Sequence, residues 1–346
     1  MIKHTFTKLL ALIFLISMAG FARSQTTDVV TTDPAETVTG LATDAVVLPT
    51  EQTVVSVGAY ILRLNNVSPR DGSFDVDMWL WFRWLGNDVR PEKTFELANG
   101  IVHERTTSDI TIDGGMNYTT VRVQGTIFHD YDVRRFPLDN HVINIEIEDA
   151  NLEDRLLTYV VDEGIALDPS VDVAGWQVGV QAATVQPHTY ATTYGLRDSG
   201  TAASVYSRFD LPITLTRTSY GPLFKAFWIS LLSVLLGLLA FLIKSDDLDA
   251  RFGMGVGSIF AASANAFVIA DSLPETTKIT LAEQINLIAV GVIFTTVFIS
   301  IWSLRLRYVG RDDDSLRLDR NAMFILGGLY LALNVLVMSV DLSGLL

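Results

Sequence analysis

Two aspartates, Asp249 and Asp271, lie near the two ends of a mainly apolar segment that runs from residue 249 to residue 274. A helix rises about 1.5 Å per residue, so roughly twenty such residues cross the hydrocarbon layer of a membrane. Carboxylates at the mouths of a water-filled passage attract cations and repel anions. The chemistry that this spacing predicts is therefore the passage of ions, with no covalent step.

One face of this predicted helix supports a pore. At about 100° per residue, the two aspartates share a side with small and bulky apolar residues, while Arg251, Ser258 and Ile269 fall roughly opposite. A ring of Phe260 side chains would form an apolar constriction that closes by excluding water. One helix cannot enclose water, so a pore requires an oligomer. A packing helix without a pore is the alternative, because small residues also suit close helix contacts. The candidate pore-lining residues are Asp249, Gly253, Gly257, Phe260, Ala264, Phe267 and Asp271.

The composition excludes several classes of function. The chain of 346 residues is 49% hydrophobic yet carries a formal charge of -14, so most of its acidic residues must lie outside the apolar segments. Such a surface favours nearby cations and argues against nucleic acid as a partner. The absence of cysteine excludes disulfides, thiolate metal sites and a cysteine nucleophile. Spaced metal ligands, a Gly-x-Ser-x-Gly motif and a phosphate loop are also missing, so we expect no enzyme, no cofactor and no metal site.

The N-terminal residues predict export. Residues 1–24 have the layout of a secretory signal peptide, in which Lys3 and Lys8 precede an apolar core too short to span a bilayer. A signal anchor is the competing interpretation. Residues 25–53 are rich in threonine, aspartate and alanine without a sustained period, which predicts a flexible leader.

Residues 54–218 show the pattern of short strands. In residues 74–84 one side is apolar and the other mostly polar. Trp79 and Trp81 lie on the polar side, where they would meet a neighbouring sheet, a subunit, a ligand or a covering loop. No helical pattern intervenes, so we predict an antiparallel, immunoglobulin-like sandwich of about ten strands. Further strands are predicted at 109–112, 118–128, 141–148, 176–185 and 208–216.

Residues 219–346 hold four apolar runs, which predict membrane spans at about 222–243, 250–272, 281–304 and 321–340. The predicted fold class is thus an all-β extracellular sandwich followed by an all-α four-helix transmembrane domain. The link between the third and fourth spans is rich in arginine, so it is expected in the cytoplasm. With the sandwich outside, Asp249 lies at the inner mouth and Asp271 at the outer one. The arginines of this link are Arg305, Arg307, Arg311, Arg317 and Arg320.

This order of domains, together with three motifs, resembles the pentameric ligand-gated ion channels, or Cys-loop receptor superfamily, especially their cysteine-free bacterial type. The segment 128–141, which contains Phe136-Pro137-Leu138-Asp139, is similar to the loop with the family's Phe-Pro-Phe-Asp signature. The strand at 206–217 ends in an arginine, as in the family. The segment 250–274 looks like the pore helix, with a basic residue at its start and Leu-Pro after its outer end. The resemblance covers the chain from about Val54 onward.

The resemblance implies a mechanical coupling between the sandwich and the pore helix. In this family the Phe-Pro loop touches the link between the second and third spans. The resemblance also suggests Asp139 as the partner of Arg217, which should not be left unpaired at a buried junction. Asp71 and lipid headgroups are the alternative partners. The candidate coupling residues are Arg217, Asp139, Phe136, Pro137, Leu273 and Pro274.

The family's ligand pocket lies between subunits, below a loop that here spans about residues 188–204. An aromatic pocket would suit an amine through cation–π attraction. His129 and His141 leave gating by protons open as well. The candidate ligand contacts are Tyr190, Tyr194 and Arg197 on this loop, with Trp79 and Trp81 facing them from a neighbouring subunit.

The sequence therefore predicts a homopentameric, ligand-gated and cation-selective channel. Its expected partners are membrane lipid, permeant cations and an unidentified small molecule. It is expected to be a multi-pass protein of a cell membrane, in particular the bacterial inner membrane, with the N-terminal domain outside. A membrane-anchored sensor or adhesion protein that conducts no ions is the alternative, because such a protein needs no carboxylates at the ends of its second span.

Overall fold

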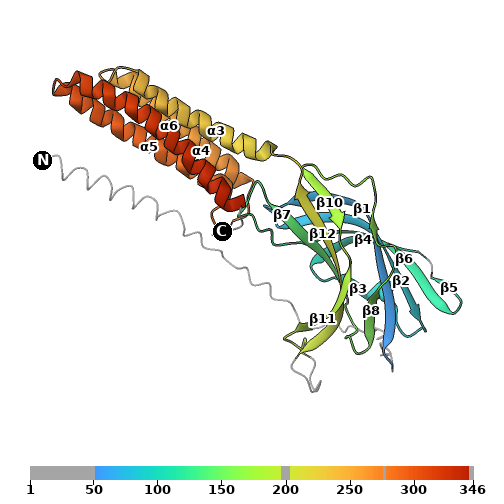
Figure 1. Ribbon diagram of the computed structural model, residues 1–346. Helices are drawn as coiled ribbons and strands as arrows, with labels where there is room; N and C mark the ends of the chain where they lie inside the picture. The colour runs from blue at the N-terminus through green and yellow to red at the C-terminus, as the bar shows by residue number, and fades with distance from the viewer. Residues whose placement is uncertain (1–50, 109, 196–202, 276–277, 343–346) are drawn as a thin grey trace, which may run out of the picture. The chain divides into compact units, whose positions relative to one another are not determined.

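The computed structural model describes residues 51–108, 110–195, 203–275 and 278–342. Within these residues the chain forms a sandwich of two sheets followed by four long helices (Figure 1). This architecture confirms the predicted fold class. The predicted signal peptide and nearly all of the predicted leader lie outside the described residues, and so does Arg197.

The first sheet has seven strands in the order β4-β6-β2-β1-β8, with β5 paired to β6 and β9 paired to β1. Its longest pairing runs between β2 and β6, from Ser73 opposite Phe128 to Leu85 opposite Met116. The strands are β1 (Thr53–Ser68), β2 (Ser73–Leu85), β4 (Gly100–Thr107), β5 (Thr111–Asp113), β6 (Met116–Phe128), β8 (Leu157–Val161) and β9 (Ala166–Leu167).

The second sheet has five strands in the order β10-β12-β7-β3, with β11 paired to β12. A single helical turn, α2 (Pro91–Thr94), precedes its first strand. The strands are β3 (Phe95–Leu97), β7 (Asn140–Asp149), β10 (Trp176–Val180), β11 (Thr184–Tyr190) and β12 (Ser204–Arg217).

Two details of the predicted sandwich were wrong. The sheets are not purely antiparallel, because β1 pairs in parallel with both β8 and β9. The predicted strand 176–185 is two strands on the same side of β12. Val180 lies opposite Ile213 and Thr184 opposite Asp210, so residues 181–183 face only residues 211 and 212, and the extra residue breaks the ladder.

The core of the sandwich follows from the alternation that the sequence displays. Phe74, Met78, Leu80 and Phe82 of β2 are each 0% exposed, and they belong to one buried cluster with the isoleucines of β7. Burying a side chain of this size stabilises the fold by about 1.5 to 3 kcal/mol. The sandwich is therefore a rigid body that can carry functional groups on its surface and at its ends.

Four helices are long and apolar enough to cross a membrane, which makes this a multi-pass membrane protein. Neighbouring helices pack side by side, α3 on α4 and α5, and α5 on α6 (Figure 1). The fourth helix begins before the predicted span because aspartates in its first turn suit a helix N-terminus and do not stop the helix. The helices are α3 (Gly221–Leu239, continued by the 3-10 turn η1, Ala240–Leu242), α4 (Leu248–Asp271), α5 (Leu281–Tyr308) and α6 (Asp312–Leu342).

Candidate pore, coupling and ligand sites

The candidate pore helix α4 buries one side and leaves the other uncovered. Within the single chain, Phe260 is 72% and Phe267 77% exposed, and Asp249, Gly253 and Ala264 are also exposed. Gly257 is half-buried, at the edge of the uncovered face. The buried residues recur every three or four positions, as expected for a helix that packs on one side only. They are Arg251, Gly255, Ser258, Ala262, Asn265 and Ile269.

The start of α4 separates its charges by sign. Asp247 caps the helix by accepting a hydrogen bond from the Ala250 amide at 3.3 Å, and Asp249 follows it, exposed, in the first turn. The Arg251 side chain is only 2% exposed. Its guanidinium donates to the Ile243 carbonyl at 2.9 and 2.7 Å and forms an ion pair with Asp319 of α6. At this end of α4 the exposed face therefore carries the Asp249 carboxylate, whereas the nearby Arg251 is buried on the other side.

At the other end of α4, the sandwich supplies a partner for Asp271 that sequence reasoning missed. The Arg70 guanidinium lies 2.5 Å from the Asp271 carboxylate and 2.8 Å from its carbonyl oxygen. Arg70 belongs to the turn between β1 and β2, 201 positions earlier in the chain. Both side chains are more than half exposed, so water and salt screen this pair. Asp271 thus carries less uncompensated charge than Asp249.

Arg217, the last residue of β12, lies in an aromatic and acidic environment. Its Nε donates to Asp139 at 3.2 Å, and its guanidinium carbon lies 3.9 Å from the centre of the Trp176 ring. The second carboxylate oxygen of Asp139 lies 2.6 Å from Nε2 of His141. Burial alone would raise the pKa of Asp139, but the hydrogen bond from His141 and the charge of Arg217 hold it below its ordinary value. Asp139 is therefore a buried anion held from two sides.

The Phe-Pro loop binds the start of α5 through its backbone. The carbonyl oxygens of Arg134 and Phe136 accept hydrogen bonds from the first two amides of α5, Leu281 and Ala282, at 2.9 and 3.1 Å. The first amides of a helix have no hydrogen-bond acceptor within the helix itself. Leu273 is buried in the apolar cluster against which Phe136 packs, whereas Pro274 is half-buried. The loop therefore binds α5 directly. Its Phe136 also packs against the apolar cluster that contains Leu273 of the link, the neighbour that the resemblance suggested.

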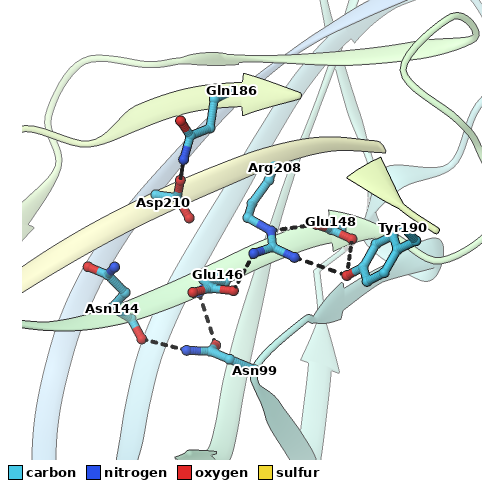
Figure 2. A network of polar contacts seen from close by, with 8 residues as sticks. All are labelled: Asn99, Asn144, Glu146, Glu148, Gln186, Tyr190, Arg208 and Asp210. Atoms are coloured by element: carbon cyan, nitrogen blue, oxygen red, sulfur yellow. Dashed lines mark hydrogen bonds and ion pairs between the residues drawn. The ribbon is translucent and has the colours of Figure 1, made fainter. Parts of the chain in front are cut away.

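A network of polar side chains crosses the outer face of the second sheet (Figure 2). Arg208 of β12 lies at its centre, 2.5 Å from Glu148 and 2.7 Å from Glu146, both on β7. The hydroxyl of Tyr190 donates to Glu148 at 3.0 Å and accepts from Arg208 at 3.0 Å. Although alternation places Glu148 on the polar side of its strand, its side chain is only 1% exposed. Sequence reasoning did not include these charged residues. The signal available for them was the pair Glu146 and Glu148 on alternate positions of β7, with Arg208 on the strand at 208–216.

Tyr190 also lies among other rings. Its ring centre lies 4.6 Å from that of His188, 5.8 Å from that of Tyr206 and 6.0 Å from that of Tyr194. Burial raises the pKa of Tyr190 to about 12, and the hydrogen bond to Glu148 adds to the shift. Burial would lower the pKa of Arg208, but its bonds and charge interactions with the glutamates raise it overall. At neutral pH the cluster offers aromatic faces beside carboxylates and one arginine.

The two tryptophans lie on the other sheet. Trp81 is half-buried, its ring lies against Gly58, and its indole nitrogen donates to Asp162 at 2.8 Å. A side chain at Gly58 would come within 2.2 Å of the Trp81 ring, which explains a glycine at this position. Trp79 is half-buried and pairs across the ladder with Tyr60 and Arg122. Within one chain neither tryptophan joins the Tyr190 cluster.

The two-sheet sandwich that leads into four membrane-length helices, with a Phe-Pro loop bonded to the start of α5, resembles the architecture of Cys-loop receptor subunits. The chain resembles this superfamily and shows weak homology to its gamma-aminobutyric acid receptor subunits, and its sequence contains no cysteine. It is 25% identical over 276 residues to the gamma-aminobutyric acid receptor subunit rho-1 of Homo sapiens, which covers 71% of this chain and 54% of the relative. It is also 25% identical over 224 residues to the gamma-aminobutyric acid receptor subunit beta of Caenorhabditis elegans, covering 62% of this chain and 37% of the relative.

The chain thus spans about half the length of the rho-1 subunits that it matches. A scan against models of protein families finds no match. The relatives are receptor subunits, in agreement with the expectation that this chain is not an enzyme.

Proposed function

We propose that this chain is the subunit of a homopentameric, cation-selective ion channel that a small extracellular ligand opens. The observation that carries the proposal is the uncovered face of α4, where exposed phenylalanines lie between Asp249 and Asp271. Such a face needs either lipid or neighbouring copies to cover it, and lipid is a poor environment for aspartate. Five copies around an axis would turn this face toward water.

The arrangement of charge at the start of α4 supports selectivity for cations. Asp249 is exposed, whereas Arg251 points into the helix bundle and is neutralised by Asp319. By the excess of arginine after α5, this end of α4 lies in the cytoplasm and the sandwich lies outside. The inner mouth is therefore the proposed filter.

The Tyr190 cluster supports an amine as the ligand. Aromatic faces stabilise an ammonium group by about 0.5 to 2 kcal/mol per good contact, and the neighbouring glutamates add charge complementarity. The names of the relatives identify them as receptors for gamma-aminobutyric acid, which carries an amine and a carboxylate. In this chain Arg208 supplies a cation for a carboxylate and Glu146 an anion for an amine, while the buried Glu148 adds negative charge behind them.

The direct test is to record currents from the purified protein in planar bilayers. We expect currents that follow the cation gradient and that appear on adding one member of a panel containing gamma-aminobutyric acid, simple primary amines and acidic buffer. Acid as the sole activator would support protons as the ligand. Assembled protein that stays silent across the whole panel, including with Phe260→Ala, would favour a non-conducting sensor.

Removing the proposed apolar constriction gives the first mutational prediction. Phe260→Ala replaces the bulkiest exposed side chain near the middle of α4, so water should enter the closed passage. We expect a current without ligand. Phe324→Ala on α6, which is 68% exposed and outside the proposed pore, is the matched control and should leave the resting current unchanged. Equal leak in both variants, or in neither, would contradict a gate at Phe260.

The ligand site gives the second prediction. Glu148→Gln keeps the shape of the side chain but removes its charge from the Tyr190 cluster. A hydrogen bond to a charged group contributes about 1.5 to 3 kcal/mol, so the half-activating concentration of an amine should rise roughly tenfold or more. Glu104→Gln removes an exposed carboxylate on β4 of the other sheet and should cause no shift. An unchanged dose response in Glu148→Gln would place the ligand elsewhere.

A further inference from the structure

Three polar side chains from three different helices meet inside the membrane-spanning bundle. Nδ2 of Asn265 on α4 lies 2.9 Å from Oγ of Ser230 on α3, 3.0 Å from Oδ1 of Asn286 on α5 and 3.3 Å from the carbonyl oxygen of Ala226. The exposed fractions of Asn265, Ser230 and Asn286 are 2%, 0% and 5%. We refer to Asn265, Ser230 and Asn286 as the amide cluster.

The amide cluster has more acceptors than the Asn265 amide has hydrogens. An amide group carries two hydrogens, yet three oxygens lie within reach of this one. The Ser230 hydroxyl has a single hydrogen, with the Ala226 carbonyl at 3.1 Å and Asn286 Oδ1 at 3.3 Å as its possible acceptors. Each of these hydrogens therefore has more than one oxygen within reach, so the pairing can be shared or exchanged. The cluster can therefore hold α4 in more than one hydrogen-bonded arrangement.

The amide cluster lies on the side of α4 away from its uncovered face. Asn265 is buried, whereas Ala264 and Phe267 beside it in the sequence are exposed. Successive helix residues are about 100° apart, so a small rotation of α4 changes which of its residues face outward. Hydrogen bonds from Asn265 to helices on both sides oppose such a rotation. Apolar contacts alone, being non-directional, would oppose it less.

We propose that Asn265 is a positioning residue that fixes the rotation of α4 against α3 and α5, and through it the direction in which Phe260 and Phe267 face. The inference rests on the proposed channel function. It assigns the amide cluster a part in opening, since an exchange of partners within the cluster would permit a second rotation of α4.

The chain contains no cysteine, so any introduced cysteine is unique and can report on this rotation. Phe267→Cys and Val268→Cys flank Ala264 on opposite sides of the exposed face of α4. The rates at which a charged, water-soluble thiol reagent modifies these cysteines are measured in reconstituted protein, first with Asn265 and then with Asn265→Leu. We expect the two rates to change several-fold and in opposite directions, as a rotation requires.

Asn334→Leu is the matched control, because Asn334 is another buried asparagine in the bundle whose donor bond, among the described residues, stays within its own helix, to the Tyr330 carbonyl at 2.8 Å. It should leave both rates unchanged. If a ligand opens the reconstituted channel, Asn265→Leu should also shift the half-activating concentration of that ligand by about fivefold, the factor expected for one net hydrogen bond. If Asn265→Leu does not assemble, Ser230→Ala removes only one hydrogen-bond partner of Asn265. It should also change the two modification rates in opposite directions.

The possible outcomes separate the two proposals. Unchanged rates in an assembled Asn265→Leu protein, or the same change in Asn334→Leu, would overturn the positioning role while leaving the pore intact. If the reagent fails to reach Phe267→Cys in the otherwise unaltered protein, no water lies on this face, and the pore and the inference fall together.

Discussion

Asp249→Lys should move the reversal potential in a salt gradient from the cation value toward the anion value. In the proposed pentamer, neighbouring carboxylates about 8 Å apart in a wet mouth repel each other by roughly 0.5 to 1 kcal/mol per pair, so the ring stays largely ionised. Five negative charges around one narrow opening set a strong negative potential, and five lysines would invert it. The measurement is the reversal potential of single reconstituted channels under asymmetric potassium chloride.

Asp313→Lys is the matched control for this prediction. It makes the same change of charge at an exposed position in the first turn of α6, at the start of another helix. The reversal potential should stay at the cation value in this variant. An unchanged reversal potential in Asp249→Lys would mean that another ring selects the ions, and Asp271 would then be tested next.

The ion pair between Arg251 and Asp319 explains why Asp249 is expected to dominate. Asp249 and Arg251 are two positions apart in the sequence, and their charges would cancel if both side chains faced the same opening. The structure turns Arg251 to the buried side, where it binds the Ile243 carbonyl and Asp319. At the other end, Arg70 lies 2.5 Å from Asp271 in an exposed, screened pair and offsets part of its charge. Among the residues that the structure describes, Asp249 at the start of α4 is an exposed carboxylate without such an arginine partner.

The division of α4 into two faces could be read from the sequence, because helical periodicity is a local property. Arg251, Ser258 and Ile269 fall opposite the aspartates at about 100° per residue, and all three are buried. The alternation in β2 is local in the same sense, and it predicted the buried face of the sandwich. Patterns with a fixed period thus identified the elements and their faces.

Contacts between distant parts of the chain could not be read in this way. The bond from Arg70 to Asp271 joins a turn to a helix end, and Arg70 belongs to no periodic pattern that could have indicated it. The burial of Glu148 depends on Tyr190 and Arg208 from two other strands, and alternation alone placed it on the polar side. The Phe-Pro loop binds Leu281 and Ala282 through backbone hydrogen bonds, which the types of the side chains do not indicate.

Arg217→Ala should abolish ligand-evoked current while the protein still assembles in the membrane. Arg217 lies at the end of the strand that leads into α3, and it contacts Asp139 of the Phe-Pro loop, whose backbone in turn holds the start of α5. Removing the guanidinium leaves Asp139 buried with its hydrogen bond to His141 and takes the cation away from the face of Trp176. Uncompensated burial of a carboxylate is costly, so the loop should shift away from its present position.

Two further variants decide whether this loss reflects coupling. Arg217→Lys keeps the charge but cannot both stack on Trp176 and bind Asp139 through a planar group, so it should restore only part of the response. Arg155→Ala removes an arginine from an exposed pair in the same sandwich and should respond normally. The measurements are the ligand-evoked current, the binding of the same ligand and the oligomer size in detergent. Binding and assembly should persist in Arg217→Ala, because the residue touches neither the Tyr190 cluster nor the exposed face of α4. A normal evoked current in that variant would show that the sandwich moves the pore by another route, and the Arg70–Asp271 contact would be the first alternative.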